Sequence, residues 1–319
     1  MKLDELRKLA ALEAVMPVQD GSAETYARIK ELLAENGLDL SNIYQELEMS
    51  SPYVNTHRDI SYGFPRVSIH SHAYGELIYC RKAEGVEYLV GADRYRMRQG
   101  DVILVLPGVS HCPLLAENMD EPYIRDVIWI SPEFLNHFAE LTGMRGDDKN
   151  LDLSPLRTAG TKWEFIGELF AKGVREEELA EPGWEATVMG NTLMILGYLQ
   201  RFYAERSEGA IKAEKPELLD RITGFVERHY TDHIAIGDLA KHFYVSSSTI
   251  SHLFKQKMGI SFYRYVTQRR LIAAKTLIER GRLLENVALE VGFSDYSSFY
   301  RAFKQEYGIS PRQYRPRRE

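Results

Sequence analysis

The sequence has few cysteines and no long apolar run, and each absence excludes a class of protein. Only Cys80 and Cys112 occur among its 319 residues. Two thiols do not make a disulfide framework, so we expect a reducing, cytoplasmic environment. No stretch approaches the roughly 18 consecutive apolar residues that a membrane span needs, so we expect no membrane partner. The start, Met1 to Glu5, lacks the basic and apolar segments of a signal peptide.

Overall positive charge is also lacking, since the formal net charge is -6. The charge is nevertheless uneven along the chain. Residues 211–319 carry 19 Lys+Arg and 12 Asp+Glu, a net of +7, whereas residues 1–210 carry 21 and 34, a net of −13. A slice of this size can drift to such a value by chance, so charge only supports other evidence. An acidic body with a basic end is typical of a sensor fused to a domain that binds phosphates.

Hydrophobic periodicity divides the chain into four parts and predicts a multidomain protein of α and β structure. Short β-rich runs in the second part, separated by Gly, Pro and Asp, predict an antiparallel sandwich or small barrel. The third part contains two helices, which Glu181 to Gly183 separate, and the second helix is apolar over more than one face. That helix is therefore buried on two sides or lies in a dimer interface. The predicted parts are an N-terminal helical extension (1–48), a β barrel (49–135), a helical linker or dimerisation segment (136–210) and an all-α domain (211–319).

An internal repeat is the strongest signal in the last third. The segment Phe254–Ser261 recurs as Phe303–Ser310, with six of eight positions identical at an offset of 49. Further upstream, Leu239-Ala240 matches Val287-Ala288 at an offset of 48. The chain therefore contains the same structural unit twice.

Each copy of the repeat predicts a short helix, a tight turn and a longer recognition helix. In the first copy, Ser246 is the expected N-cap of the longer helix, and Gly259 is suited to the left-handed conformation that ends it. In the second copy, Ser294 is the expected N-cap and Gly308 ends the helix. The two predicted recognition helices span about 247–257 and 295–307.

A single long helix, capped by Ser261 and closed by Gly281, is predicted between the two units. About 19 residues at 1.5 Å each give about 29 Å. Successive major-groove faces of DNA are about 34 Å apart. A spacer of this length favours two recognition helices on neighbouring turns of one DNA face.

The outward faces of the recognition helices carry side chains that suit DNA. Ser, His and Arg can meet base edges, and Lys suits phosphates. The alternative is that these are the solvated faces of an all-α packing domain. The predicted DNA-binding residues are Ser247, Ser248, Ser251, His252 and Lys255 in the first helix, and Ser297, Ser298, Arg301 and Lys304 in the second.

The run from Gly292 to Lys304, followed by Gly308 to Pro311 and Tyr314-Arg315, resembles the signature of the AraC/XylS-type regulators. The resemblance covers roughly residues 215–315. It implies a bipartite DNA-binding domain fused to an N-terminal sensor or dimerisation domain. By position, it implies base contacts from Ser248, Ser251, His252, Ser297, Ser298 and Arg301.

A second constellation of polar residues lies in the β-rich part. Positions two apart on a strand share a face, so His70, His72, Tyr74 and Glu76 point the same way if the strand is regular. The turn at Pro107-Gly108 brings His111 across from them. Three imidazoles and a carboxylate suit a divalent transition metal, so His70, His72, Glu76 and His111 are candidate metal ligands. The same residues and Tyr74 are candidate effector-binding residues.

This pattern resembles the cupin barrel, whose metal motif is H-x-H-x(3)-E followed later by G-x(2)-H. Gly108 and His111 keep the second spacing, whereas Leu106 stands where proline is usual. Sensor barrels of the AraC type often carry such histidines without a firmly bound metal. The resemblance therefore leaves two roles open: the side chains bind a metal, or they hydrogen-bond a small effector or one another. Aromatic residues on strands are more often only core, but four are candidates for apolar walls around a sugar-like ligand: Tyr74, Tyr79, Tyr88 and Trp129.

Together, these features predict a sequence-specific transcription regulator and not an enzyme. We expect a small, sugar-like effector in a cupin-like barrel, with the helices near 161–205 transmitting its effect. The expected partners are double-stranded promoter DNA, the effector and a second copy of the chain, with RNA polymerase as a further candidate. Two alternatives stay open: a metal-dependent cupin enzyme tethered to DNA, and a constitutive regulator whose barrel only dimerises.

Overall fold

The computed structural model describes residues 49, 51–61, 69–115, 119, 121–143, 154–205, 211–279 and 281–315. The helices predicted within 1–48 and the linker predicted at 207–210 lie outside this part of the chain. Within it, no helix combines the length and apolarity that crossing a membrane requires.

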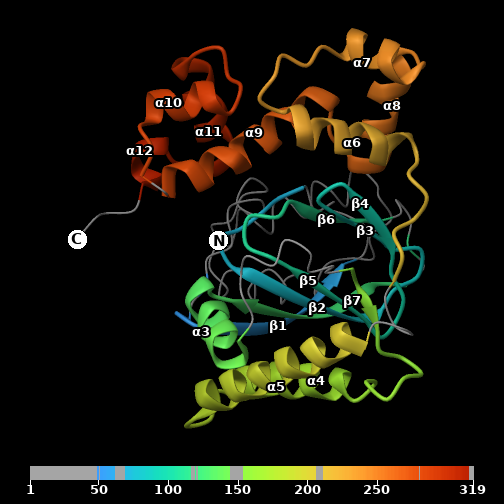
Figure 1. The fold of residues 1–319 in the computed structure, drawn as a ribbon, viewed down its shortest axis with the longest axis vertical. Helices are drawn as coiled ribbons and strands as arrows, with labels where there is room; N and C mark the ends of the chain where they lie inside the picture. Colours follow the sequence, from blue (N-terminus) through green and yellow to red (C-terminus); the bar gives the residue numbers. More distant parts are fainter. Residues whose placement is uncertain are drawn as a thin grey trace, which may run out of the picture.

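Two antiparallel sheets form the N-terminal half of the described chain, called here the β domain (Figure 1). Neighbouring strands pair in antiparallel register throughout both sheets. The larger sheet has the order β1 (Val54–Ser61), β7 (Tyr123–Ile130), β2 (Gly75–Lys82), β5 (Asp101–Val105) and β8 (Leu156–Arg157). The smaller sheet has the order β4 (Asp93–Arg96), β3 (Glu87–Val90) and β6 (His111–Leu114).

Alternation along β2 explains why the larger sheet is buried on both faces. Leu77 and Tyr79 belong to the cluster that packs against helices, whereas Ile78 and Cys80 belong to the cluster between the sheets. Successive residues of a strand point to opposite faces, so a strand covered on both sides is apolar throughout.

The β domain extends past its predicted end at residue 135. The short strand β8 pairs Leu156 with Val102 of β5. Arg157 donates to both carboxylate oxygens of Asp101, at 2.8 and 3.0 Å, which fixes this added strand at the sheet edge. Both contacts join residues about 55 positions apart in the sequence. Hydrophobic periodicity reports only on neighbouring residues, so it could not predict β8.

Helices cover the outer face of the larger sheet. α4 (Ile166–Leu179) and α5 (Trp184–Glu205) share one buried cluster with β1, β2 and β7, and α3 (Pro132–Thr142) begins at the side-chain cap Ser131. The predicted break before α5 is present, and Gly183 has a φ of +91°. α5 buries residues along its length, such as Val188 and Phe202, while Met194 is exposed.

The C-terminal domain is entirely helical over its described residues. It contains α6 (Leu218–His229), α7 (Ile236–Phe243), α8 (Ser247–Met258), α9 (Phe262–Glu279), α10 (Leu284–Glu290), α11 (Tyr296–Tyr307) and α12 (Pro311–Tyr314). α7 with α8, and α10 with α11, form the two predicted helix-turn-helix units. α9 joins them, and its 18 residues span about 27 Å.

Local capping chemistry sets the ends of both recognition helices. Ser246 accepts from the backbone N–H of Thr249 at 3.0 Å and caps α8 as predicted. The prediction that Ser294 caps α11 is wrong, because Asp295 accepts from Ser298 N–H at 2.8 Å. The Asp295 carboxylate takes the cap position because it accepts the free N–H at the start of the helix. The hydroxyl of Ser294 instead donates to Asp295 at 2.9 Å.

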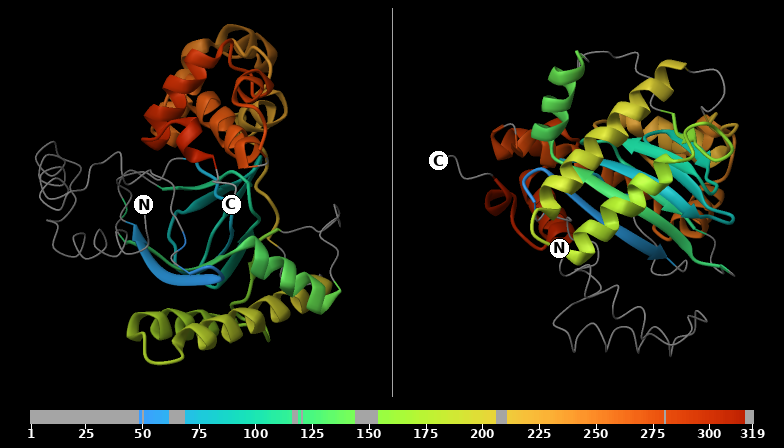
Figure 2. Two further views of the ribbon diagram at one scale, coloured as in Figure 1. Left: turned by 90° about the vertical axis from the view of Figure 1, so that its left-hand side faces the viewer. Right: turned by 90° about the horizontal axis from the view of Figure 1, so that it is seen from below.

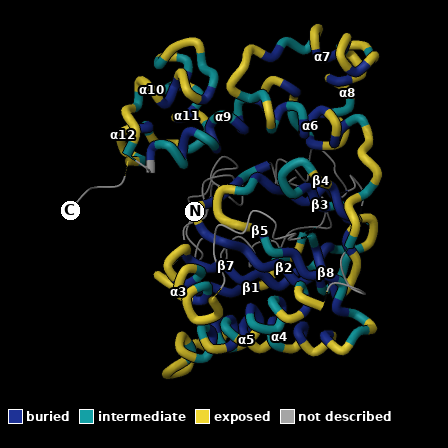
Figure 3. The backbone as a smooth tube through the Cα atoms, in the orientation of Figure 1, coloured by how far each residue is buried: buried dark blue, intermediate teal, exposed yellow. Residues whose placement is uncertain are grey.

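The C-terminal domain and the pair α4–α5 lie on opposite sides of the β domain (Figures 1 and 2). The strands between them are mostly buried, whereas exposed positions gather on the outer helices (Figure 3). Arg94 of β4 donates to both carboxylate oxygens of Asp220 in α6 at 3.1 Å, with both residues about 5% exposed. The smaller sheet is thus in direct contact with the C-terminal domain.

Candidate functional site

The first recognition helix, α8, presents most of its predicted residues to solvent. Its inner face buries Ile250 and Phe254 completely. Ser251 donates its hydroxyl to the carbonyl of Ser247 at 3.0 Å, so part of the serine face is occupied within the helix. The exposed predicted residues are Ser248, Ser251, His252 and Lys255, and Ser247 is half-buried.

The second recognition helix, α11, also has a buried apolar face and an exposed polar face, and its polar face carries both an arginine and a lysine. Phe299 and Phe303 are fully buried, as predicted. Arg301 reaches the hydroxyl of Ser298 at 3.5 Å, which holds the guanidinium near the N-terminal half of the helix. The exposed predicted residues are Ser297, Arg301 and Lys304, and Ser298 is half-buried.

The C-terminal ends of both recognition helices face the β domain. Met258, the last residue of α8, lines a recess with Cys112 and Leu114 of β6. Tyr307, the last residue of α11, packs under the ammonium of Lys275, which in turn contacts the β domain at Ser71. The N-terminal end of each 12-residue helix therefore lies about 18 Å from these contacts along the helix axis.

The predicted polar residues of the β domain converge, although not on a regular strand. His70 forms an isolated bridge with His111, the chain bends at Ala73 and Tyr74, and β2 begins only at Gly75. The condition of a regular strand from 70 to 76, on which the shared face of Tyr74 and Glu76 with the histidines depended, is therefore not met. The bend still brings the side chains together, because the His70 segment pairs with the start of β6 and Glu76 enters from β2.

The histidine cluster, defined here as His70, His72, His111 and Glu76, is compact. One ring nitrogen from each histidine lies within 4.8 Å of the others. The His70 and His111 ring centroids are 4.3 Å apart, and those of His72 and His111 are 4.9 Å apart. The candidate effector residue Tyr74 stacks on His72 with centroids 3.9 Å apart, so the structure brings all the predicted residues together.

Two backbone carbonyls fix the orientation of the imidazoles. The Nδ1 atom of His72 lies 2.7 Å from the carbonyl of Tyr74, and the Nδ1 atom of His111 lies 2.9 Å from that of Val109. A carbonyl only accepts, so both Nδ1 atoms carry the proton. In the neutral rings, both Nε2 lone pairs then face Glu76, at 3.6 Å from His72 and 3.0 Å from His111.

Glu76 is the acceptor at the centre of the cluster. Burial acts to raise its pKa, but the imidazoles of His111 and His72 beside the carboxylate outweigh that effect and hold the pKa well below its usual range. Burial is also the largest influence on His72, whose pKa is lowered. A lone pair and a carboxylate repel each other, so the 3.0 Å contact between His111 and Glu76 requires a proton or a cation between them.

The donor set fits a divalent transition metal by its chemistry. Three imidazole nitrogens and a carboxylate match the ligands of zinc and related ions. The Nε2 atom of His72 is buried and has no hydrogen-bond partner in the described part of the chain. Histidine ligands usually donate their other N–H to a carbonyl or carboxylate, as His72 and His111 do here.

Trp129 has a role that the sequence did not reveal. Its indole N–H donates to Glu76 at 2.9 Å, and its ring packs edge-on against His57 at 4.5 Å. The sequence predicted Trp129 only as an apolar wall of the ligand site. Alternation along β7 could indicate that Trp129 faces inward, but not that it donates to Glu76. The prediction that Tyr79 forms a wall of the ligand site is wrong, because its side chain faces the outer helices and packs against Phe170 of α4.

Cys112, adjacent to His111, is a buried apolar thiol. It is 1% exposed, and burial raises its pKa to about 12. A thiol with this pKa stays protonated near neutral pH, so it is not poised for nucleophilic or ligand chemistry.

Comparison with known proteins identifies the C-terminal domain. Residues 239–317 match the family described as "Helix-turn-helix domain". The chain is 40% identical over 141 residues to the "Probable transcriptional regulator LumQ" of Photobacterium leiognathi, covering 43% of this chain and 54% of that protein. It is 25% identical over 256 residues to the "HTH-type transcriptional activator RhaS" of Salmonella arizonae, covering 78% and 88%.

Among solved structures, the chain is similar to ToxT from Vibrio cholerae. The two are 13% identical, and the alignment covers 83% of this chain and 95% of that one, with a TM-score of 0.38.

Proposed function

We propose that the chain is an AraC-type DNA-binding transcription regulator whose β domain is a cupin-like sensor that binds a small effector at the histidine cluster. The alternative of an enzyme tethered to DNA is set aside, because the relatives named above are transcriptional regulators or activators. A regulator that binds promoter DNA in a bacterium works in the cytoplasm, and we propose that location for this protein.

The DNA-binding half of the proposal rests on one observation. Two helix-turn-helix units present polar recognition helices whose N-terminal ends lie away from the β domain, joined by a helix of about 27 Å. Recognition helices use their N-terminal residues to contact base edges. We assign phosphate contacts to Lys255 and Lys304. The residues that we assign to base contacts are Ser248, Ser251, His252, Ser297, Ser298 and Arg301.

The sensor half rests on the buried polar side chains between the sheets. The histidine cluster, Tyr74 and Trp129 offer ring faces and hydrogen-bonding groups in one enclosed place. A sugar-like metabolite uses both, because its hydroxyls pair with polar groups and its C–H face packs on aromatic rings. Buried polar groups without such a role would carry a desolvation cost.

A bound divalent metal is a second candidate for the same site. The orientation of His72 and His111, with both Nδ1 protons given to carbonyls, favours it specifically. His70, His72, His111 and Glu76 would hold the ion, which would supply a positive charge to Glu76 and an open position for an effector.

Two further partners belong to the proposal. A second copy of the chain would account for the apolar breadth of α5, on which Met194 is exposed. RNA polymerase is a partner of any regulator that activates transcription by contact. The remaining alternative is a constitutive regulator, in which the β domain forms the dimer and binds no effector.

Selection from a random DNA duplex pool tests the proposed function. The full-length protein is expected to enrich one bipartite sequence, and enrichment of no sequence contradicts the DNA-binding half. Thermal unfolding with a panel of sugars, and separately with Zn²⁺ or Ni²⁺, tests the sensor half. A shift with none of them contradicts the sensor half alone.

A further inference from the structure

We propose that α9 responds to the state of the histidine cluster through two routes, one from each backbone segment that carries the histidines: a direct contact of Lys275, and a contact of Arg269 through Glu227 of α6. This inference rests on the proposed function of the cluster as the effector site. It names the structural element that responds, which is the helix joining the two helix-turn-helix units.

The histidine-bearing segments move as one unit because they are hydrogen-bonded to each other. The backbone groups of His70 and His111 exchange two hydrogen bonds, at 3.1 and 2.9 Å. The N–H of Gly108 also donates to the carbonyl of His72 at 2.9 Å. A ligand that displaces any of these imidazoles therefore displaces both segments.

The first contact starts at the residue before His111. The hydroxyl of Ser110 donates to Glu227 of α6 at 3.1 Å. Glu227 accepts from Arg269 of α9 at 2.7 Å, and the Arg269 guanidinium lies over the ring of Tyr230. Ser110 and Arg269 are both less than one-tenth exposed, and the Glu227 side chain between them is 18% exposed, so the chain of contacts is largely shielded from competing water.

The second contact starts at the residue between His70 and His72. The ammonium of Lys275 in α9 donates to the carbonyl of Ser71 at 3.5 Å. The same ammonium lies over the rings of Tyr307 and Tyr314, at 5.2 and 5.7 Å from their centroids. Lys275 is 4% exposed, so it links the β domain to the second helix-turn-helix unit from a buried position.

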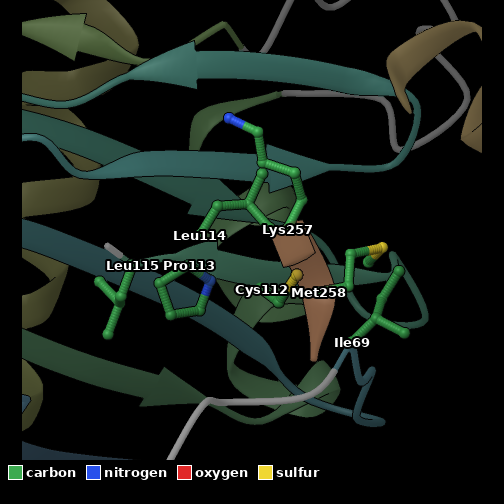
Figure 4. A pocket seen from close by; sticks show the side chains of 7 residues that line it. All are labelled: Ile69, Cys112, Pro113, Leu114, Leu115, Lys257 and Met258. Carbon is green, nitrogen blue, oxygen red and sulfur yellow. The ribbon is translucent and has the colours of Figure 1, made fainter. Parts of the chain in front are cut away.

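Apolar packing holds the first unit against the same segments. Ile69 and Cys112, which flank His70 and His111, belong to one buried cluster with Phe254 and Met258 of α8. Figure 4 shows the recess at this junction, where side chains of β6 approach the end of α8. The polar contacts to α9 therefore lie next to a buried apolar interface between the β domain and the first helix-turn-helix unit.

The arrangement assigns signal transmission to α9 rather than to the helices at 161–205. α4 and α5 pack on the far side of the β domain from the recognition helices (Figure 1). Arg269 and Lys275 lie nearly two turns apart on one helix whose ends lead into the two units. A shift of the histidine segments would therefore change how the two recognition helices are placed relative to each other.

Hydrogen exchange of the full-length protein, without DNA or effector, tests this coupling. Lys275→Met keeps the apolar stem and removes the ammonium. We expect exchange in peptides covering residues 69–72 to accelerate about fivefold, the effect of losing roughly one hydrogen bond. Arg264→Met is the matched control, because that cation of α9 pairs with Glu306 of α11 and should leave residues 69–72 unchanged. Equal exchange at residues 69–72 in the wild type and Lys275→Met would overturn the proposal.

The reverse experiment starts from the cluster. Glu76→Gln is expected to accelerate exchange across residues 269–275, and the combined Lys275→Met and Ser110→Ala background should remove this response. Persistence of the response in that background would overturn the proposal. If Glu76→Gln does not fold, the Lys275→Met measurement decides alone. A protein that shows this coupling but binds no DNA would refute the proposed function and leave the inference intact.

Discussion

The Nε2 atom of His111 lies 3.0 Å from a carboxylate oxygen of Glu76, and His111 is fully buried while Glu76 is 8% exposed. The pair brings a strand of each sheet into contact, since His111 begins β6 and Glu76 lies in β2. Trp129 adds a third strand by donating to the other oxygen of Glu76. This relationship ties the candidate sensor site to the packing of the whole β domain.

Removing the Glu76 carboxylate should weaken metal binding. In a calorimetric titration with Zn²⁺, Glu76→Gln is expected to raise the dissociation constant by at least about tenfold, because a charged ligand becomes a neutral amide. His252→Gln is the control, since this exposed histidine lies on α8 and away from the cluster. Equal Zn²⁺ affinity in the wild type and Glu76→Gln would exclude the cluster as the metal site.

Arg301→Ala should relax sequence preference at one base pair by about 1–3 kcal/mol. The guanidinium is exposed on α11 near its N-terminal half and can pair with two acceptors of a guanine. Fluorescence anisotropy with single-base variants of the selected site measures the preference. A uniform loss of affinity on all sequences would show that Arg301 contacts phosphate only. Lys304→Ala is the comparison, for which that uniform loss is expected.

Tyr244→Gly should stabilise the C-terminal domain by about 0.5–1 kcal/mol. Tyr244 caps the end of α7 at a φ of +56°, and the residue is 94% exposed. The left-handed conformation costs about 1–2 kcal/mol for an L-residue, and the extra chain entropy of glycine offsets part of the gain. Denaturant unfolding measures the change, and a loss of stability would show that the tyrosine side chain packs usefully.

Gly292→Ala should have the opposite effect, although Gly292 occupies the equivalent turn of the second unit at the repeat offset of 48. Its φ is +90°, and an added Cβ would lie 2.6 Å from the carbonyl oxygen of Thr231 and 2.8 Å from that of Tyr230. Backbone strain and overpacking together are expected to cost about 3 kcal/mol. The control is Gly237→Ala in α7, where an added Cβ meets no described atom within 4 Å. Equal unfolding free energies for the two variants would contradict the prediction.

Much of the C-terminal domain was predictable because its signals are local. The Ser246 cap, Gly259 with its φ of +73° and the buried Ile250 and Phe254 all follow from residues within one helix. The Ser294 prediction failed because two capping residues stand side by side, and the sequence does not show which side chain reaches the free N–H. In the β domain, the donor types and their closeness in sequence were enough to predict the set, although the two-residue period fails at the bend before Gly75.

Contacts distant in sequence could not be predicted. Trp129 and Glu76 are 53 residues apart, and Lys275 and Ser71 are 204 apart. Their meeting depends on strand order and domain docking, for which a single sequence carries no periodic signal. The same limit applies to β8, which only the pairing with β5 defines.

The stability of the second unit should fall at acidic pH through Asp295. The backbone and hydroxyl of Ser298 donate to its carboxylate and lower its pKa from the ordinary 3.8. A lowered folded-state pKa adds stability that is present above about pH 4 and is lost as the pH falls through the lower folded value. Urea unfolding between about pH 5 and 2.5 should show a smaller pH dependence for Asp295→Asn, which has no titrating group at this cap. Identical slopes in the two proteins would contradict this assignment.

Hydroxyl-radical footprinting on the selected duplex tests the central claim most directly, because it reports how both recognition helices sit on DNA at once. One bound chain should protect two patches separated by about one helical turn, roughly 10–10.5 base pairs, on the same face of the duplex. Arg301→Ala should weaken only the patch bound by the second unit. A single patch, or no protection at modest salt, would contradict the claim that both helix-turn-helix units bind DNA.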